Sequence, residues 1–254
     1  MRCAGLKFAL LGLCLALAAC SGEGTGLSVL TAGNGGPQTP DKAGFNPFNQ
    51  VSETAQSARE IIANPTMAEV MEPGPLPEMS WGKADAPVTI VQYASLSCPH
   101  CRRFHLESYP QFKREFIDTG KVRYILREFP IGKSSGTATV ALRCAPADKY
   151  LTLYEKFMSQ QGAWVSQEVR TAEILKVAAQ VGITGEQFDA CLKNQDMIAK
   201  LNQIKERGRK LGVIGTPNYF INAKLVKSAI GLNEIRAAVS AAEATPVAAA
   251  VKVN

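Results

Sequence analysis

The sequence is poor in histidine and in the paired ligands from which protein metal sites are built. It contains two histidines, His100 and His105, and no second C-x-x-C or H-x₃₋₅-H pattern follows its single C-x-x-C at residues 98–101. A structural zinc site needs four ligands. We expect His105, four residues beyond Cys101, to lie at the surface or in a groove and not to bind metal. The sequence therefore predicts neither a metal site nor a cofactor.

The net charge is small and the sequence has no internal repeat. Of the formal charge of +6, two positive charges, Arg2 and Lys7, lie in a segment that we expect to be removed, which leaves +4. Basic residues are interspersed with acidic ones in stretches such as "FKREFID" (112–118) and "KERGRK" (205–210). Such mixtures are typical of solvated helix faces. A nucleic-acid-binding groove is therefore not predicted.

The apolar run near the N-terminus is too short to cross a bilayer as a helix. "FALLGLCLALAA" (8–19) has twelve residues, whereas a spanning helix needs about 20. After a short basic start, such a run is typical of a signal peptide, which we expect over residues 1–19. Residues 17–20 resemble the lipobox of bacterial lipoproteins, in which the cysteine, here Cys20, is lipidated and becomes the first mature residue. Ordinary cleavage to a soluble protein is the alternative; in both cases the mature chain lies outside the cytoplasm, where disulfides persist.

Residues 20–79 are expected to form a tether between this anchor and a folded domain. The stretch 21–50 is rich in Gly, Pro, Thr and Asn and has no sustained apolar period, so it cannot bury enough surface to fold. Residues 52–63 could form a short helix capped by Ser52. A single folded domain is predicted over 80–243, followed by a frayed tail over 244–254.

The predicted domain alternates strands and helices. The expected elements are a strand over 86–96, a helix over 99–118 with a possible kink at Pro110, a strand over 121–129, a helical insertion over about 134–212, a hairpin over 218–222 and 224–228, and a helix over 232–244. A right-handed crossover makes the first two strands parallel. The hairpin then adds antiparallel strands to the same sheet. The fold class is α/β, with the helical insertion placed on one side as a lid or subdomain.

The C-x-x-C pair lies where the first predicted strand ends and a helix begins. Cys98 is expected at or near the N-cap and Pro99 in the first turn, where a proline fits well. The unpaired amides and partial positive charge of a helix start stabilise a thiolate, so the pKa of Cys98 should fall below about 8.5. His100 is expected to add to this effect, and each pKa unit gives about 30 mV of oxidising power. Cys101, one turn deeper, is expected to be the buried resolving thiol.

The C-x-x-C pair has two other interpretations. A purely structural disulfide in so small a ring would gain little chain entropy, and a zinc site lacks two further ligands. Redox activity is therefore the prediction for Cys98 and Cys101.

Two further features bear on the site. Outside the cytoplasm, Cys144 and Cys191 are expected to pair with each other, in a loop whose closure could contribute about 4 kcal/mol; a second catalytic pair is the alternative. Thr216-Pro217 precedes the aromatic strand "NYF" (218–220), and this proline is either an ordinary turn residue or a cis proline.

Three stretches together resemble the DsbA-like thiol–disulfide oxidoreductases of bacterial cell envelopes. They are "APVTIVQYASLSCPHC" (86–101), "REFP" (127–130) and "IGTPNYFIN" (214–222). The resemblance covers roughly residues 80–243 and implies a thioredoxin-like fold interrupted by a helical domain. It implies that Thr216 and Pro217 form a cis-proline loop that faces the disulfide and binds the client backbone. Some members also carry a cysteine pair in the helical domain, as at Cys144 and Cys191.

One position departs from the family pattern. Six residues before the nucleophile, oxidases of this kind often carry a buried glutamate that ferries protons to the resolving thiol, and here that position is Gln92. A neutral amide does not titrate, so water or another group would have to take over the proton transfer.

The expectation is a periplasmic dithiol oxidase, anchored to a membrane by lipid at Cys20. It would donate disulfides to reduced, unfolded client proteins and be reoxidised by a membrane quinone-linked partner similar to DsbB, which the resemblance implies. The alternatives are a disulfide reductase or isomerase, and a non-catalytic chaperone-like protein that binds clients in an apolar groove. Threonine before Pro217 also occurs in the isomerase branch, so the loop does not distinguish the first two.

Overall fold

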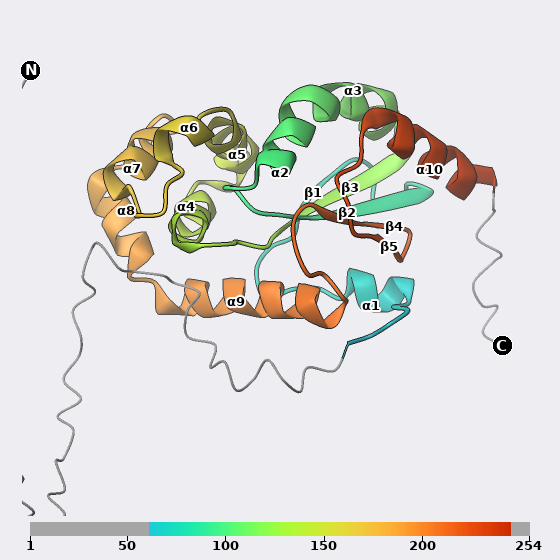
Figure 1. The fold of residues 1–254 in the computed structure, drawn as a ribbon, viewed down its shortest axis with the longest axis horizontal. Coiled ribbons are helices and arrows are strands. Elements are labelled where there is room, and N and C mark those ends of the chain that lie inside the picture. The colour runs from blue at the N-terminus through green and yellow to red at the C-terminus, as the bar shows by residue number, and fades with distance from the viewer. Residues whose placement is uncertain (1–60, 245–254) are drawn as a thin grey trace, which may run out of the picture. The chain divides into compact units, whose positions relative to one another are not determined.

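A five-stranded sheet forms the centre of the computed structural model, which describes residues 61–244 (Figure 1). The strand order is β1-β3-β2-β4-β5. The strands are β1 (Met79–Trp81), β2 (Val88–Ala94), β3 (Val122–Glu128), β4 (Asn218–Ile221) and β5 (Lys224–Val226). The predicted signal peptide, Cys20 and nearly all of the tether helix predicted for 52–63 lie outside the described residues, as does the tail beyond residue 244.

The predicted strand directions are confirmed. β2 and β3 are parallel, β4 is antiparallel to β2, and β5 is antiparallel to β4. The β4–β5 hairpin turns at Asn222 and Ala223, whose φ angles of 44° and 59° fit the left-handed turn that joins twisted antiparallel strands. The Asn222 side chain also accepts a hydrogen bond from the backbone N–H of Thr89 at 2.7 Å. This contact ties the hairpin to β2.

The segment before residue 80 is more ordered than a tether. A short helix, α1 (Met67–Met71), begins at a capping box formed by Thr66 and Glu69, and β1 pairs with the edge of β3. The side chain of Arg127 donates a hydrogen bond to the backbone oxygen of Val70 at 2.7 Å. The helix expected over 52–63 is not present in the described end of that range, since Ile61 and Ile62 are not helical.

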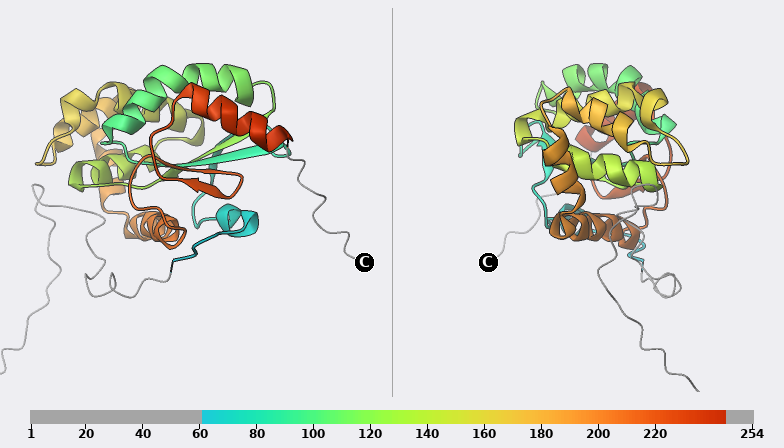
Figure 2. Two further views of the ribbon diagram at one scale, coloured as in Figure 1. Left: turned by 45° about the vertical axis from the view of Figure 1, so that its right-hand side comes forward. Right: turned by 90° about the vertical axis from the view of Figure 1, so that its left-hand side faces the viewer.

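The two faces of the sheet are covered by different helices (Figures 1 and 2). One face bears the helix that follows β2, which is continuous over 99–117 and is built from α2 (Pro99–Arg103), α3 (Tyr109–Phe112) and two π-helical segments, Phe104–Ser108 and Lys113–Ile117. α10 (Leu232–Ala244) lies on the same face. The other face bears α1 and α9 (Gln195–Lys210). β2 is buried along its whole length because both of its faces are covered.

The alternation of side chains along the strands gives two apolar cores. Ile90 and Tyr124 point into the larger core, with Cys101 of α2. Val91 and Phe220 point into the smaller one, beneath α9 and α1. The period of two thus determines which strand residues share a core with Cys101.

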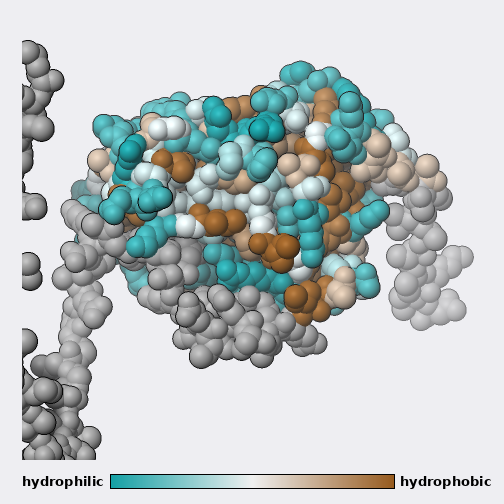
Figure 3. Space-filling view, viewed as in Figure 1, coloured by the Kyte–Doolittle hydropathy of each residue, from teal (hydrophilic) through white to brown (hydrophobic). Residues whose placement is uncertain are grey.

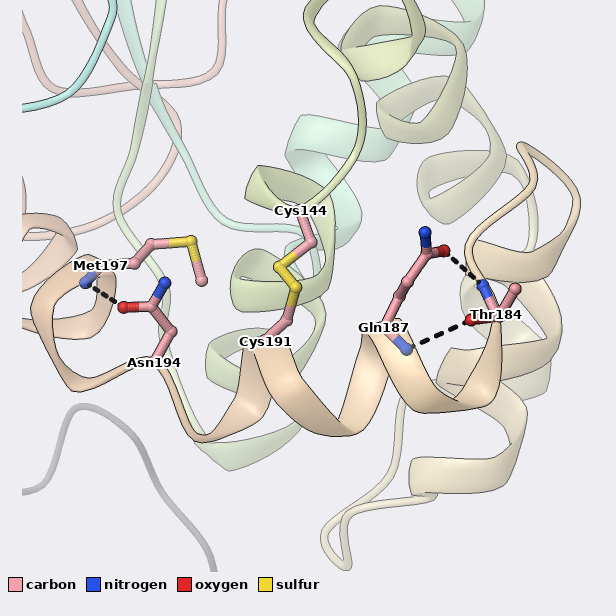
Figure 4. The surroundings of a disulfide bond; sticks show 6 residues. All are labelled: Cys144, Thr184, Gln187, Cys191, Asn194 and Met197. Atoms are coloured by element: carbon pink, nitrogen blue, oxygen red, sulfur yellow. Dashed lines mark hydrogen bonds between the residues drawn. A yellow bond between two sulfur atoms is a disulfide. The ribbon is translucent and has the colours of Figure 1, made fainter.

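The helical insertion lies beside the sheet and continues onto its second face. Its helices are α4 (Lys133–Arg143), α5 (Tyr150–Ser159), α6 (Gln161–Trp164), α7 (Thr171–Ala179) and α8 (Gly185–Leu192), with a 3₁₀ turn at Ala147–Lys149. The prediction that all of 134–212 lies on one side is wrong for α9, because Gly208 lets that helix pack against the Tyr93 ring on the opposite face. A disulfide joins Cys144, at the end of α4, to Cys191 of α8 (Figure 4).

The described surface has scattered apolar patches. On the face shown in Figure 3, brown apolar areas alternate with hydrophilic ones. The most exposed large apolar side chain is Ile214, which is 76% exposed. Within residues 61–244, none of the helices combines the length and hydropathy that a membrane-crossing helix requires.

Candidate active site

Cys98 is the N-cap of α2, as its position before Pro99 predicts. Its backbone is extended, Pro99 occupies the first turn, and the backbone N–H of Cys101 donates a hydrogen bond to the Cys98 sulfur at 3.4 Å. The residue is partly exposed. The residue therefore combines access with the donors of a helix start.

The surroundings of Cys98 stabilise its thiolate. The pKa falls from 9.0 to about 5, chiefly because of a hydrogen bond with Cys101. Partial burial opposes the shift, while the Thr216 side chain and the backbone amides of Cys101 and His100 lower the pKa further. The Thr216 hydroxyl is buried and has no other hydrogen-bond partner in the described structure, which leaves it free to donate to a thiolate.

Cys101 has the opposite character. Its side chain is fully buried, and burial, followed by its hydrogen bond with Cys98 and the charge of that residue, raises its pKa well above the ordinary value. The two sulfurs are free thiols in this structure. The pair therefore consists of an accessible, acidic thiol, which a thiolate from outside can attack in the disulfide form, and a buried thiol that stays protonated.

The Thr216–Pro217 peptide bond is cis, and its loop lies beside Cys98. The Cys98 thiol donates a hydrogen bond to the backbone oxygen of Thr216 at 3.2 Å, over 118 residues of sequence. The Asn218 side chain donates to the Pro217 oxygen at 2.9 Å. The structure thus brings together Cys98, Pro99, Cys101, Thr216 and Pro217 in one place.

Residues that the sequence patterns did not indicate hold the loop before Cys98 in place. Gln161, from α6 of the insertion, is buried and donates hydrogen bonds to the backbone oxygens of Leu96 at 2.6 Å and Cys98 at 3.1 Å. Ser95 bonds to Ser135 of α4 at 2.8 Å. The helical insertion is therefore attached directly to the loop that carries Cys98.

The two histidines lie in different environments. His100 is exposed and acts on Cys98 through its backbone amide. His105 lines a groove, as predicted, but is only 5% exposed: it stacks on Tyr109 at 4.8 Å between ring centroids and contacts the edge of Tyr154 at 4.9 Å. Burial lowers its pKa from 6.5 to about 4, which keeps the ring neutral. Among the described residues, no group of three or more His, Cys, Asp or Glu side chains could hold a metal ion.

Gln92 lies in the core beneath the site. It is 1% exposed, its side-chain oxygen accepts a hydrogen bond from the Tyr124 hydroxyl, and its side-chain nitrogen has no partner in the described structure. The neutral amide that replaces the family's glutamate is thus buried and only half satisfied.

Comparison with known proteins agrees with this geometry. A family model described as thioredoxin matches residues 76–241. The chain belongs to the thioredoxin family. Its fold is also that of the crystal structure of Wolbachia pipientis α-DsbA1, with a TM-score of 0.64 and 24% identity over 72% of this chain and 98% of that one. The expected DsbA-like, thioredoxin-like fold with a helical insertion is therefore confirmed.

Two curated relatives have names that refer to disulfide chemistry. A Rickettsia bellii protein, provisionally named a protein-disulfide oxidoreductase, is 31% identical over 65% of this chain and 64% of its own length. A Bacillus cereus protein, provisionally named disulfide bond formation protein D, is 30% identical over 58% of this chain and 71% of its own length. The chain thus spans just under two thirds of the rickettsial relative.

Proposed function

We propose that this DsbA-like chain is a thiol:disulfide oxidoreductase that donates disulfide bonds to client proteins. A client thiolate attacks the sulfur of Cys98 in the oxidised pair, the Cys98–Cys101 bond breaks, and Cys101 leaves as a thiolate. A second client thiolate then attacks the client sulfur of the mixed disulfide, and Cys98 leaves. The client gains one disulfide and the protein keeps two electrons as the reduced pair.

The observation that carries this proposal is the lowered pKa of Cys98, of about 5. A thiolate held by a helix start and by Thr216 stabilises the reduced pair relative to the disulfide, and a stabilised reduced form makes the disulfide a stronger oxidant. The same low pKa makes Cys98 a good leaving group in the second step. Both effects favour donation of a disulfide to a client over reduction of a client's disulfide.

Replacing Cys98 tests the mechanism. We expect Cys98→Ser to abolish disulfide transfer to a reduced peptide with two thiols, measured by thiol release and by peptide mass. Cys144→Ser combined with Cys191→Ser is the control, since neither sulfur takes part in the scheme. Undiminished transfer by the Cys98→Ser protein would contradict the proposal.

The reduction potential decides the direction of exchange. Equilibrium with glutathione buffers should give a value toward that of DsbA, about −120 mV, and away from that of thioredoxin, about −270 mV. A value at the thioredoxin end would favour the reductase alternative.

A groove beside the cis-proline turn supports unfolded proteins as clients. Its lining includes the apolar residues Phe129, Ile131 and Ile214 and the basic residues Lys205 and Arg209. Ile131 and Ile214 are 47% and 76% exposed, so they are open to extended apolar segments. The Ile131 oxygen accepts a hydrogen bond from Ser97, the residue before Cys98, which connects this groove with the C-x-x-C loop. Unfolded chains expose such segments and folded ones bury them.

The location and the oxidant belong to the same proposal. We propose a periplasmic protein that is anchored by lipid at Cys20 and reoxidised by a membrane quinone-linked partner, as the N-terminal sequence and the resemblance suggest. Intact-mass measurement after thiol alkylation tests the anchor, since acylation adds the mass of the lipid and removes the signal peptide. A mature chain without Cys20 or without acyl mass would contradict it.

A further inference from the structure

The opening of the catalytic disulfide creates a protonation problem at Cys101. In the proposed function, Cys101 leaves as a thiolate at a position that is 0% exposed, where burial strongly disfavours the charge. Its sulfur therefore needs a proton from a group inside the core. The titratable groups of the core that act electrostatically with Cys101 include the phenols of Tyr124, Tyr154 and Tyr219.

Three unsatisfied polar atoms lie in this part of the core. The side-chain nitrogen of Gln92 and the hydroxyls of Tyr109 and Tyr219 are buried and have no hydrogen-bond partner in the described structure. Such groups usually bind an ordered water, which satisfies two to four of them at once. Three orphaned atoms in one apolar core point to a polar function of the cluster.

The sheet register brings these residues together beneath α2. Gln92 of β2 is the direct cross-strand partner of Tyr219 of β4, and the Tyr124 hydroxyl of β3 donates to the Gln92 oxygen. Direct cross-strand partners have Cβ atoms about 5 Å apart. Tyr124 and Tyr219 belong to the core cluster that contains Cys101. Gln92 therefore lies between the two phenols, on the face that carries the catalytic helix.

The outer end of the cluster reaches a surface groove. Tyr109 packs on Tyr124 with ring centroids 5.4 Å apart, and it lines a groove that also contains Glu155 and Asp118. Burial is the largest cause of the raised pKa of Tyr109, and the charges of Glu155 and Asp118 raise it further. The Tyr109 hydroxyl therefore lies within the electrostatic reach of these two carboxylates. Tyr109 thus connects the core phenols with groups that exchange protons with solvent.

We propose that Tyr219, Gln92, Tyr124 and Tyr109 form a proton relay that protonates the Cys101 sulfur as the catalytic disulfide opens. The Tyr219 hydroxyl gives its proton to the Cys101 thiolate and receives one from a buried water, which the Gln92 nitrogen holds. Tyr109 resupplies that water from the groove, and Tyr124 orients the Gln92 side chain through its hydrogen bond to the Gln92 oxygen. The net change is one proton moved from solvent to Cys101. The electron pair of the client thiolate forms the new sulfur–sulfur bond with Cys98, and Cys101 keeps the pair of the disulfide bond that breaks. Gln92 and Tyr124 act as positioning residues.

The proton lost by Tyr219 must be replaced as it leaves. Burial, and then the charges of Cys101 and Cys98, raise the pKa of Tyr219 well above 10, so a lasting tyrosinate would be unfavourable. A relay open to solvent avoids this charge. The arrangement takes over the transfer that a titrating carboxylate at position 92 would otherwise perform.

Single-hydroxyl variants test the relay. We expect Tyr219→Phe and Tyr109→Phe each to slow single-turnover formation of the mixed disulfide between oxidised protein and a one-thiol peptide by roughly tenfold or more. Both should also change the solvent deuterium isotope effect of this step. The pKa of Cys98 in the reduced protein, read from thiolate absorbance, should stay unchanged, which separates a lost relay from a displaced nucleophile.

Tyr93→Phe is the matched control. Tyr93, on β2, is fully buried like Tyr219, but its side chain points into the other core. It should keep the wild-type rate and isotope effect. Wild-type rates in both Tyr219→Phe and Tyr109→Phe, or an equal loss in Tyr93→Phe, would overturn the relay. The relay rests on the proposed function, which fails separately: in that case the wild-type protein itself forms no mixed disulfide at Cys98.

Discussion

Cys98 and Cys101 are three residues apart and have opposite pKa shifts, because a helix start and a helix interior are different environments. The Cys98 sulfur accepts a hydrogen bond from the backbone N–H of Cys101, and the residue remains partly exposed to solvent. Cys101 is surrounded by the apolar core. The chemical asymmetry of the pair thus follows from where the helix begins.

Removal of the buried sulfur should stop the reaction halfway. In a Cys101→Ser protein, Cys98 remains a thiolate and can react with an oxidised client, but no second sulfur can release the mixed disulfide from within. We expect client–Cys98 adducts to accumulate and to be visible on non-reducing gels. Cys98→Ser should form none, and adducts in that variant would contradict the assignment of the nucleophile.

The lowered pKa of Cys98 makes the stability of the reduced protein depend on pH. Between about pH 5 and about pH 8, the unfolded chain holds a proton on this sulfur and the folded chain does not. The free energy of unfolding should therefore rise with pH in this window, and the contribution should be lost as the pH falls through 5. Urea titrations of reduced wild type and reduced Cys98→Ser test this. Parallel pH profiles of the two proteins would contradict the shift.

The local part of the site could be predicted from the sequence, and the long-range part could not. A proline after Cys98 and an apolar strand before it are enough to place the nucleophile at a helix start. Gln161 lies 63 residues from the Cys98 oxygen that it binds, so nothing near either residue signals the contact. The burial of His105 depends on its contact with Tyr154 of α5, which is likewise far from it in the sequence.

Whole helices are positioned by single small residues. A Cβ atom on Gly208 of α9 would lie 2.7 Å from the Cε1 atom of Tyr93 and 3.3 Å from the Cδ2 atom of Phe129. Both rings are buried and cannot move aside easily. The glycine therefore allows α9 to pack close to the second face of the sheet, in spite of its low helix propensity.

Gly208→Ala should destabilise the protein by about 1–3 kcal/mol, as overpacking of a core usually does. Gly162→Ala is the control, because Gly162 of α6 is exposed and no atom lies within 4 Å of its added Cβ. We expect that variant to match or slightly exceed the wild type. The midpoint of urea denaturation measures both, and equal stability of the two variants would contradict the packing argument.

At the element scale, periodicity predicted the central strands and their directions but not the N-terminal elements. β1 has three residues and α1 five, which is too short for a period to show. Their positions depend on partners from elsewhere in the chain, such as Arg127, which binds the Val70 oxygen. The sequence also could not show that α9 leaves the insertion, because that depends on Gly208 and the rings beneath it.

At the scale of the whole molecule, the disulfide links two helices within the insertion. Cys144 and Cys191 are 47 residues apart in sequence, and their bond joins α4 to α8 (Figure 4). Thr184 and Asn194 cap α8 and α9 on either side of this bond. The insertion in turn holds the catalytic loop through Gln161.

Loss of this disulfide should weaken the fold and leave the chemistry of Cys98 intact. Cys144→Ser with Cys191→Ser should lower the free energy of unfolding by about 4 kcal/mol, because the unfolded chain regains the entropy of an open loop. The pKa of Cys98 should not change, since the groups that set it lie on α2 and on the Thr216 loop. Urea denaturation and thiolate absorbance test the two statements separately, and a shifted Cys98 pKa would contradict the second.

The ionisation of one sulfur atom underlies the whole scheme of disulfide donation. Absorbance of the thiolate near 240 nm, followed against pH in the reduced protein with Cys98→Ser as the blank, measures it directly. The account predicts a transition centred at about pH 5 that the Cys98→Ser protein lacks. A transition near 8.5, the value of a cysteine in water, would contradict it.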